Sequence, residues 1–254
     1  MYSGHRFFSA LQTAACLSFI ILLTGITSCK KKEQWVDVDP AFAKYIEAYS
    51  TGIVSKTSAI RIQLSTDAAT THTVGQPVKE DLFDFTPSLK GKTVWLDART
   101  IEFKPEKNML PDQLYTVKFA LGKVTKVPAA YEEFKFNIQT IKPAFKVKQY
   151  GLRSSGEKAS MFLNGDILTA DAEEPSLVEK LLAINHSGNA YKIIWQHSNA
   201  GKTHGFTINA IKRSEKETSL QLNWNGSPLD ISNTGSETLT VPAIGDFKVL
   251  NVAT

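Results

Sequence analysis

Short runs in which apolar and polar residues alternate are the feature that most constrains how this chain can fold. The apolar side chains stand at every second position in four runs: residues 59–64, 100–104, 115–119 and 134–138. A period of two places the apolar side chains of a strand on one face of a sheet and the polar ones on the other. Turn-forming residues separate the runs, for example at residues 89–92 and 105–108. The pattern therefore predicts an antiparallel β-sandwich within residues 44–142.

A tyrosine at the start of one predicted strand supports this fold. Leu110-Pro111-Asp112 places a proline-led turn shortly before Tyr115. In immunoglobulin-like sandwiches such a tyrosine forms a corner, in which its hydroxyl group hydrogen-bonds the backbone a few residues upstream. The alternative is that Tyr115 is only one of the aromatic residues that are common in strands.

A second β-rich unit follows at residues 143–246. Its expected strands are residues 146–151, 159–164, 191–197, 206–211, 219–223 and 239–243. Four apolar residues between them recur at helical spacing: Leu177, Val178, Leu181 and Leu182. Pro175 precedes them, at a position where a helix start tolerates proline. The sequence therefore predicts one short helix within residues 173–185 of this second sandwich.

The N-terminus has the organisation of a secretory signal peptide. Arg6 precedes an apolar run at residues 14–23, which is shorter than the roughly 20 residues that span a bilayer. Ile26-Thr27-Ser28 stands immediately before Cys29, and this arrangement resembles the lipobox of bacterial lipoproteins. The resemblance implies that residues 1–28 are removed and that Cys29 is acylated on sulfur, which would anchor the chain to a membrane.

Other roles for Cys29 fit the sequence less well. Cys16, the other cysteine, lies in the segment that would be removed, so it is no lasting disulfide partner. Lysines follow Cys29 directly, and no histidine lies nearby to activate its thiol. An ordinary signal peptide with a chance cysteine remains the alternative. Residues 29–43 mix charges of both signs and are predicted to be a solvated tether.

Charge argues against nucleic acid as a partner. The chain has 29 Lys and Arg residues against 25 Asp and Glu residues, and Arg6 is the one charged residue before Cys29. A chain so close to neutrality has no strongly basic field, and no stripe of Lys and Arg follows a helix face. No cofactor is expected either.

A series of short motifs runs in order through both units. In the first unit they are residues 51–62, Phe85-Thr86-Pro87, Gly91, Trp95, Asp97, residues 99–105, Leu110, Tyr115 and Leu121-Gly122-Lys123. In the second they are residues 194–197, residues 204–206 and residues 222–229. The first set resembles the first macroglobulin-like domain of bacterial alpha-2-macroglobulins. The second is similar to the following domain in large lipoproteins of Bacteroidota.

This resemblance implies a protease-trapping function for the complete protein. In the family, an endopeptidase cuts a bait segment and the molecule collapses around it. Many members also bond the protease through a thioester made from a Cys-Gly-Glu-Gln motif. Gln34 follows Cys29 at a different spacing, so no thioester is expected in this chain, and the sequence contains no recognisable bait stretch either. The chain would be a scaffold of two macroglobulin-like sandwiches in the cell envelope, anchored at the outer membrane on its periplasmic side or at the cell surface.

The end of the chain repeats the start of the second unit. Phe145-Lys146-Val147 and Phe247-Lys248-Val249 each follow a proline within a few residues. By analogy, residues 247–254 are predicted to be the first strand of a third domain.

Catalytic and metal sites are not expected, so we predict that the chain is not an enzyme. His197 and His204 flank a predicted hairpin loop and could approach each other. Two histidines without a third ligand or a nearby carboxylate make a weak metal site. Ser155 and Lys158 match a Ser-x-x-Lys pattern, but the neighbouring Gly156 indicates an exposed turn.

Glycan binding is the alternative function, because envelope lipoproteins with tandem sandwiches also bind sugars on exposed aromatic side chains. The candidates are Trp35, Trp95, Trp195 and Trp224. Trp195 lies in an apolar run and is expected to be buried, whereas Trp224 precedes a turn and is expected to be exposed. Two or more coplanar exposed tryptophans would favour sugar binding, and buried ones would favour a scaffold.

Overall fold

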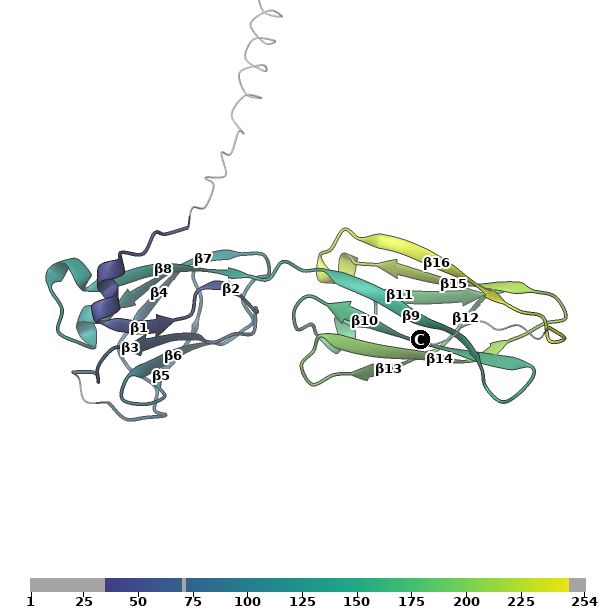
Figure 1. Cartoon of the computed structure of the whole chain (residues 1–254), viewed down its shortest axis with the longest axis horizontal. Helices are drawn as coiled ribbons and strands as arrows, with labels where there is room; N and C mark the ends of the chain where they lie inside the picture. The colour runs from purple at the N-terminus through teal and green to yellow at the C-terminus, as the bar shows by residue number, and fades with distance from the viewer. Residues whose placement is uncertain (1–34, 70–71, 247–254) are drawn as a thin grey trace, which may run out of the picture. The chain divides into compact units, whose positions relative to one another are not determined.

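The computed structural model describes residues 35–69 and 72–246, and the regular structure in these ranges is almost entirely β (Figure 1). The strands form four sheets of four strands each. One α-helix, α2 (Pro175–Val178), and four short 3-10 helices interrupt them: η1 (Pro40–Lys44), η2 (Leu121–Lys123), η3 (Ala129–Tyr131) and η4 (Ser227–Leu229). None of the helices in the described ranges has the length and apolar character needed to cross a membrane. The prediction of an all-β fold with one short helix is confirmed.

Two sheets form the first sandwich. One has the order β1 (Ile46–Tyr49), β3 (Ile60–Leu64), β6 (Thr100–Pro105), β5 (Gly91–Trp95), and its neighbours are antiparallel. The other has the order β2 (Gly52–Val54), β8 (Glu133–Thr140), β7 (Leu114–Ala120), β4 (Phe83–Thr86). In this second sheet β2 runs parallel to β8, while the other pairs are antiparallel.

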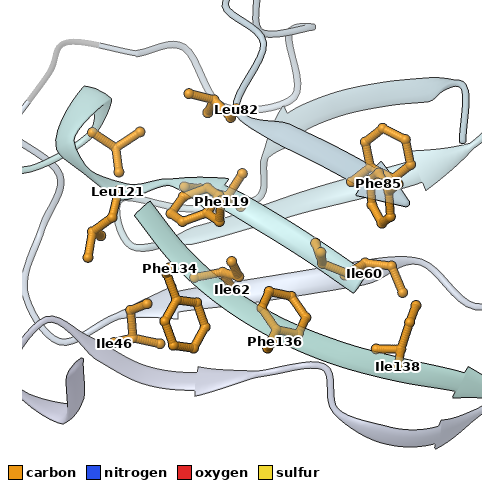
Figure 2. Packing of buried hydrophobic residues seen from close by; sticks show 14 of the residues in the cluster. Ile46, Ile60, Ile62, Leu82, Phe85, Phe119, Leu121, Phe134, Phe136 and Ile138 are labelled. Atoms are coloured by element: carbon orange, nitrogen blue, oxygen red, sulfur yellow. The ribbon is translucent and has the colours of Figure 1, made fainter. Parts of the chain in front are cut away.

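The alternation of apolar residues explains the first core. Ile60, Ile62 and Leu64 on β3 are buried, while the intervening Arg61 is exposed. Figure 2 shows the side chains of Ile60 and Ile62 gathered with Phe134 and Phe136 in one cluster. Full burial of each such side chain contributes about 1.5–3 kcal/mol of transfer free energy. This burial favours the register in which the apolar face of each strand points inward.

The tyrosine corner is present in the first sandwich. Tyr115 is buried, and its hydroxyl oxygen accepts a hydrogen bond from the backbone N–H of Leu110 at 3.0 Å. The side chain of Thr140 in turn donates to the carbonyl oxygen of Leu110 at 2.6 Å. These bonds hold the turn before β7 against β7 and β8, and the tyrosine corner predicted from the sequence is confirmed.

Two further sheets form the second sandwich, and all their strand pairs are antiparallel. Their orders are β13 (Ile193–His197), β14 (Thr203–Lys212), β10 (Ser160–Thr169), β9 (Phe145–Ser154), and β12 (Asn189–Ala190), β11 (Leu182–His186), β15 (Thr218–Asn225), β16 (Thr234–Val241). A separate hydrophobic cluster lies between them, with Leu163, Phe206 and Leu222 among its most buried members.

The predicted helix within residues 173–185 is wrong in its second half. After α2, the chain forms strand β11, in which Leu182 and Ile184 are buried and Ala183 is exposed. Leu182 fits both the helical spacing from Val178 and the strand alternation, so its apolar character alone could not decide between them. Pairing of β11 with β15 decides for the strand.

The predicted tether overlaps with a segment that contacts the first sandwich. The backbone N–H of Val36 donates to the side-chain oxygen of Asn137. The ring centroid of Phe42 lies 5.1 Å from that of Tyr131 and 4.9 Å from that of Phe134. The packed segment therefore begins before residue 43. The signal peptide, Cys29 and the predicted third-domain strand at residues 247–254 lie outside the described residues.

Candidate functional site

The hairpin of the second sandwich brings two histidines together. β13 pairs with β14 so that His197 stands opposite His204 across the strands. Their Nδ1 atoms are 2.8 Å apart, a hydrogen-bond distance. His204 is fully buried, and the side chain of His197 is 19% exposed. The prediction that these two histidines approach each other is confirmed.

A carboxylate lies beside the pair, contrary to the sequence-based expectation. Glu179 Oε1 is 3.1 Å from His197 Nε2. Glu179 is the residue that ends α2, so this one-turn helix brings it to the hairpin. The sequence alone does not indicate this contact, because Glu179 and His197 come together only when α2 and β13 pack in the same sandwich.

The hydrogen-bond partners determine how many protons the pair holds. The carbonyl oxygen of Gly201 lies 3.1 Å from His204 Nε2 and can only accept, so His204 Nε2 carries a hydrogen. An ionised Glu179 also only accepts, so His197 Nε2 carries a hydrogen. The Nδ1–Nδ1 contact requires one further hydrogen between the rings. With an ionised Glu179, this arrangement holds one proton more than two neutral imidazoles, and the carboxylate balances the positive charge.

The two rings differ in their surroundings. Burial, followed by the positive charge of His197, lowers the pKa of the His204 imidazole, and the hydrogen bond to the Gly201 carbonyl opposes this only in part. His197 has the more exposed side chain and the Glu179 carboxylate as its partner. The resulting relay runs from Glu179 through His197 and His204 to the Gly201 carbonyl oxygen.

This arrangement does not converge on a metal position. Glu179 and His204 contact opposite nitrogens of the His197 ring, so the three side chains do not point to one centre. In the part of the chain that the structure describes, no group of three or more His, Cys, Asp or Glu side chains could hold a metal ion.

A third histidine of the same sandwich is buried at the far end of β11. His186 Nδ1 lies 3.1 Å from the Tyr191 hydroxyl, and its Nε2 lies 2.8 Å from the Thr218 hydroxyl. Hydroxyl groups can donate or accept, so these contacts suit a neutral ring in either tautomer. Burial lowers the pKa of His186.

Asp171 is a buried carboxylate with three hydrogen-bond donors. It accepts hydrogen bonds from the Ser55 hydroxyl and from the backbone N–H groups of Lys56 and Ala172. Burial acts to raise the pKa of Asp171, but these bonds and the charge of Lys202 outweigh it, so the pKa is lowered. Asp171 is therefore an anchored anion, held by three donors.

An ion pair lies next to Asp171. Lys56 Nζ is 2.6 Å from Glu173 Oε2, and the two side chains are only 14% and 6% exposed. A partly buried pair of this kind is screened less by salt than a surface pair. Together with Asp171 it links residues 55–56 to residues 171–173.

A hollow of about 340 Å³ lies beside Trp95 in the first sandwich. The His72 ring stacks on Trp95 with 3.9 Å between centroids, and the indole itself is 3% exposed. Lys79, Glu80 and Lys123 are in the walls, and Lys123 already donates to the Asp81 carbonyl oxygen at 2.9 Å. The lining mixes these charged side chains with apolar ones, among them Val78 and Val124.

The tryptophans do not form a sugar platform. Trp95 is buried, and Trp195 and Trp224 are partly buried against the second core. A Cβ atom on Gly235 would lie 2.5 Å from the Trp224 ring, which shows how closely that ring covers the backbone of β16. The expectation that Trp224 is exposed is therefore wrong. Trp35, at 53%, is the exposed one of the four.

The Ser-x-x-Lys pattern falls in an exposed turn, as predicted. Ser155 lies between β9 and β10, and its hydroxyl group is 2.6 Å from that of Ser160.

Comparisons with known proteins give distant likenesses in structure alone. No protein-family model matches the chain, and no curated protein matches it. An L,D-transpeptidase from Mycobacterium tuberculosis H37Rv is similar over 63% of this chain and 72% of its own, with a TM-score of 0.27 and 12% identity. Bovine butyrophilin is similar over 81% and 97%, with a TM-score of 0.30 and 9% identity. The serine-rich repeat protein Srr2 from Streptococcus agalactiae is similar over 84% and 98%, with a TM-score of 0.22 and 8% identity. Such low scores support no inference about activity.

Proposed function

We propose that this chain is the lipid-anchored, N-terminal scaffold part of an alpha-2-macroglobulin-like protease inhibitor in the bacterial cell envelope. The observation that carries the proposal is one strand order that occurs in both sandwiches. The order β1-β3-β6-β5 corresponds to β9-β10-β14-β13, and β8-β7-β4 corresponds to β16-β15-β11. In chain order these are strands A-B-E-D and G-F-C of an immunoglobulin-like sandwich.

The tyrosine corner supports the same assignment. Tyr115 lies on the strand that corresponds to F, and its bond to Leu110 N–H is the one that this corner makes in immunoglobulin-like domains. Macroglobulin-like domains belong to this class of sandwich, as the resemblance implies. Because one fold hosts many functions, the protease-trapping part of the proposal rests on the ordered motifs in the sequence.

The tryptophans favour a scaffold over a glycan-binding protein. Sugar platforms need aromatic faces that are open to solvent, whereas Trp95, Trp195 and Trp224 pack against their own sandwiches. Trp35 alone offers one exposed ring among them.

The anchor is tested by replacing Cys29. The variant Cys29→Ala should remain unprocessed or be released from membranes, since several acyl chains hold a protein far more firmly than one. Cys16→Ala is the matched control, because it removes a thiol from the segment expected to be cleaved and should leave membrane attachment unchanged. A Cys29→Ala protein that loses its signal and still sediments with membranes would contradict the anchor.

The protease-trapping role is tested on the complete product of the gene. After reaction with a general endopeptidase, the protease should still cleave a small peptide substrate but resist a large protein inhibitor. The present chain alone should not inhibit, because it is expected to lack the bait and the thioester. Equimolar inhibition by this chain would show that the active part is misplaced. Tight binding of an oligosaccharide would favour the glycan-binding alternative.

A further inference from the structure

The histidine relay joins two parts of the second sandwich that are distant in sequence. Glu179 at the end of α2 is hydrogen-bonded to His197 at the end of β13, and His197 to His204 at the start of β14. His204 ends the relay at the Gly201 carbonyl oxygen, within the hairpin loop at residues 198–202. That same oxygen accepts the backbone N–H of Glu173 at 2.8 Å.

We propose that this relay is a proton-operated latch: a second proton, taken from solvent by His204 Nδ1, breaks the hydrogen bond between the two imidazoles and loosens the hairpin loop where β13 and β14 meet. The proton adds to the lone pair that now accepts the His197 N–H. Both Nδ1 atoms then carry hydrogens at a separation of 2.8 Å, where neither can accept. No bond other than this hydrogen bond has to break.

The charges around the pair favour opening once that proton is bound. Glu179, from the segment after α2, is the carboxylate in contact with the pair. From the segment after β10, Asp171 is held by Ser55 and Lys56, and Glu173 is paired with Lys56. Within the loop itself, Lys202 adds a positive charge, 3.9 Å from Asp171. Two imidazolium ions would therefore share one carboxylate.

Apolar neighbours complete the surroundings. Ile167 on β10 stands opposite His204, and the ring of Trp195 lies parallel to that of His197 with centroids 5.9 Å apart. Neither side chain offers a hydrogen-bond acceptor for the second proton. The doubly protonated pair can regain solvation only if the histidines separate and the loop admits water.

The direction of the pH dependence follows from the lowered pKa of His204. The unfolded chain takes up this proton near the usual histidine value of about 6.5, whereas the folded chain does so only at lower pH. His204 therefore does not reduce the free energy of unfolding above about pH 6.5. That free energy falls as the pH drops from about 6.5 toward the pKa of His204 in the folded chain. Within that window, the folding equilibrium changes by up to about tenfold per pH unit. His186 acts in the same direction, so equilibrium stability alone does not isolate the latch.

The latch is therefore tested by nuclear magnetic resonance of the histidine rings in the purified chain. At pH 7.5, His197 should show hydrogens on both nitrogens, and His204 should show one, on Nε2. On acidification toward pH 5, His204 should gain its second hydrogen. The hydrogen-exchange rates of the Ser198 and Gly201 amides, divided by the rates of an unstructured peptide at the same pH, should rise at least tenfold. Amides of the first core should not respond. A neutral His197 at pH 7.5, or a His204 that titrates at or above pH 6.5, would overturn the proposal.

Two variants separate the latch from general acid sensitivity. Glu179→Gln removes the counter-charge, so His197 should show a single N–H at pH 7.5. Glu174→Gln, at the exposed start of the same helix, is the matched control and should leave both ring spectra unchanged. Unaltered ring spectra in Glu179→Gln would also overturn the proposal. The wild-type spectra test the proton count even if a variant folds poorly.

Discussion

Gly165 and Gly205 lie on neighbouring strands of one sheet, and an added methyl group should destabilise the fold at Gly165 but have little effect at Gly205. On β10, a Cβ at Gly165 would lie 2.3 Å from Phe206 Cζ and 2.4 Å from the carbonyl oxygen of Lys148. Comfortable contacts between carbon atoms are about 3.5–4.0 Å. Phe206 is 1% exposed, and Lys148 presents backbone, so neither can move without disturbing the core or the sheet.

The size of the effect can be worked out from this crowding. Forcing an extra methyl group into a packed core costs about 1–3 kcal/mol, and occasionally more. Replacing glycine in a strand returns about 0.5–1 kcal/mol through the lower entropy of the unfolded chain. Because Gly165→Ala meets obstacles on two sides, we expect a cost at the upper end of this range and a net loss of about 2 kcal/mol. For a sandwich of this size that lowers the Tm by about 8–16 °C.

Gly205→Ala is the matched control. Its Cβ would meet Asp166 Oδ1 and the Gln196 carbonyl oxygen at 3.5 Å, which is ordinary contact. Its stability should therefore stay within about 1 kcal/mol of wild type. Urea denaturation followed by tryptophan fluorescence reports on this sandwich through Trp195 and Trp224, which pack against its core. Equal midpoints for the two variants would refute the reasoning, because it rests on the difference in space at the two positions.

Two further predictions concern hydrogen-bonded side chains. Tyr115→Phe keeps the ring but leaves the Leu110 N–H without its acceptor, so we expect a loss of about 1–2 kcal/mol in urea denaturation, and an unchanged midpoint would show that water replaces the hydroxyl group. Asp171→Asn should lower the free energy of unfolding at pH 7, and that free energy should then decrease less steeply than in wild type as the pH is lowered. The sign follows from the lowered pKa of Asp171, since such a carboxylate stabilises the fold above the unfolded value near 3.9 and loses that contribution as pH falls through the folded pKa. A parallel acid profile for wild type and Asp171→Asn would contradict it.

The sequence predicts the strands that alternate strictly and misses those whose pattern is short or ambiguous. Residues 59–64 and 134–138 show the alternation that β3 and β8 bury. β4 covers only Phe83–Thr86, which is too short to show a clear period. β11 was expected to be helical because neighbouring leucines satisfy both periods. A few residues can satisfy the period of a helix and that of a strand at once. Pairing with a distant strand, here β15, then decides which of the two structures forms.

The candidate sites show the same limit. The approach of His197 and His204 follows from their places on either side of one hairpin, which is local information. The contact with Glu179 could not be predicted, because it depends on how α2 packs. The exposure of Trp224 was misjudged because Gly235, on the paired strand β16, leaves room for the indole to lie flat. Cys29 falls outside the described residues, so its role remains a prediction.

The parallel pairing of β2 with β8 has a consequence for the order in which the chain can acquire structure. Gly52 on β2 stands beside Ile138, so this sheet cannot close until the last strand of the first sandwich is available. β8 also brings Phe134, Phe136 and Ile138 to the core. During synthesis, which starts at the N-terminus, the chain would therefore have an open, aggregation-prone sheet until residue 140 has been made. From that point the first sandwich has every strand of its two sheets, so it can fold while the second sandwich is still being synthesised.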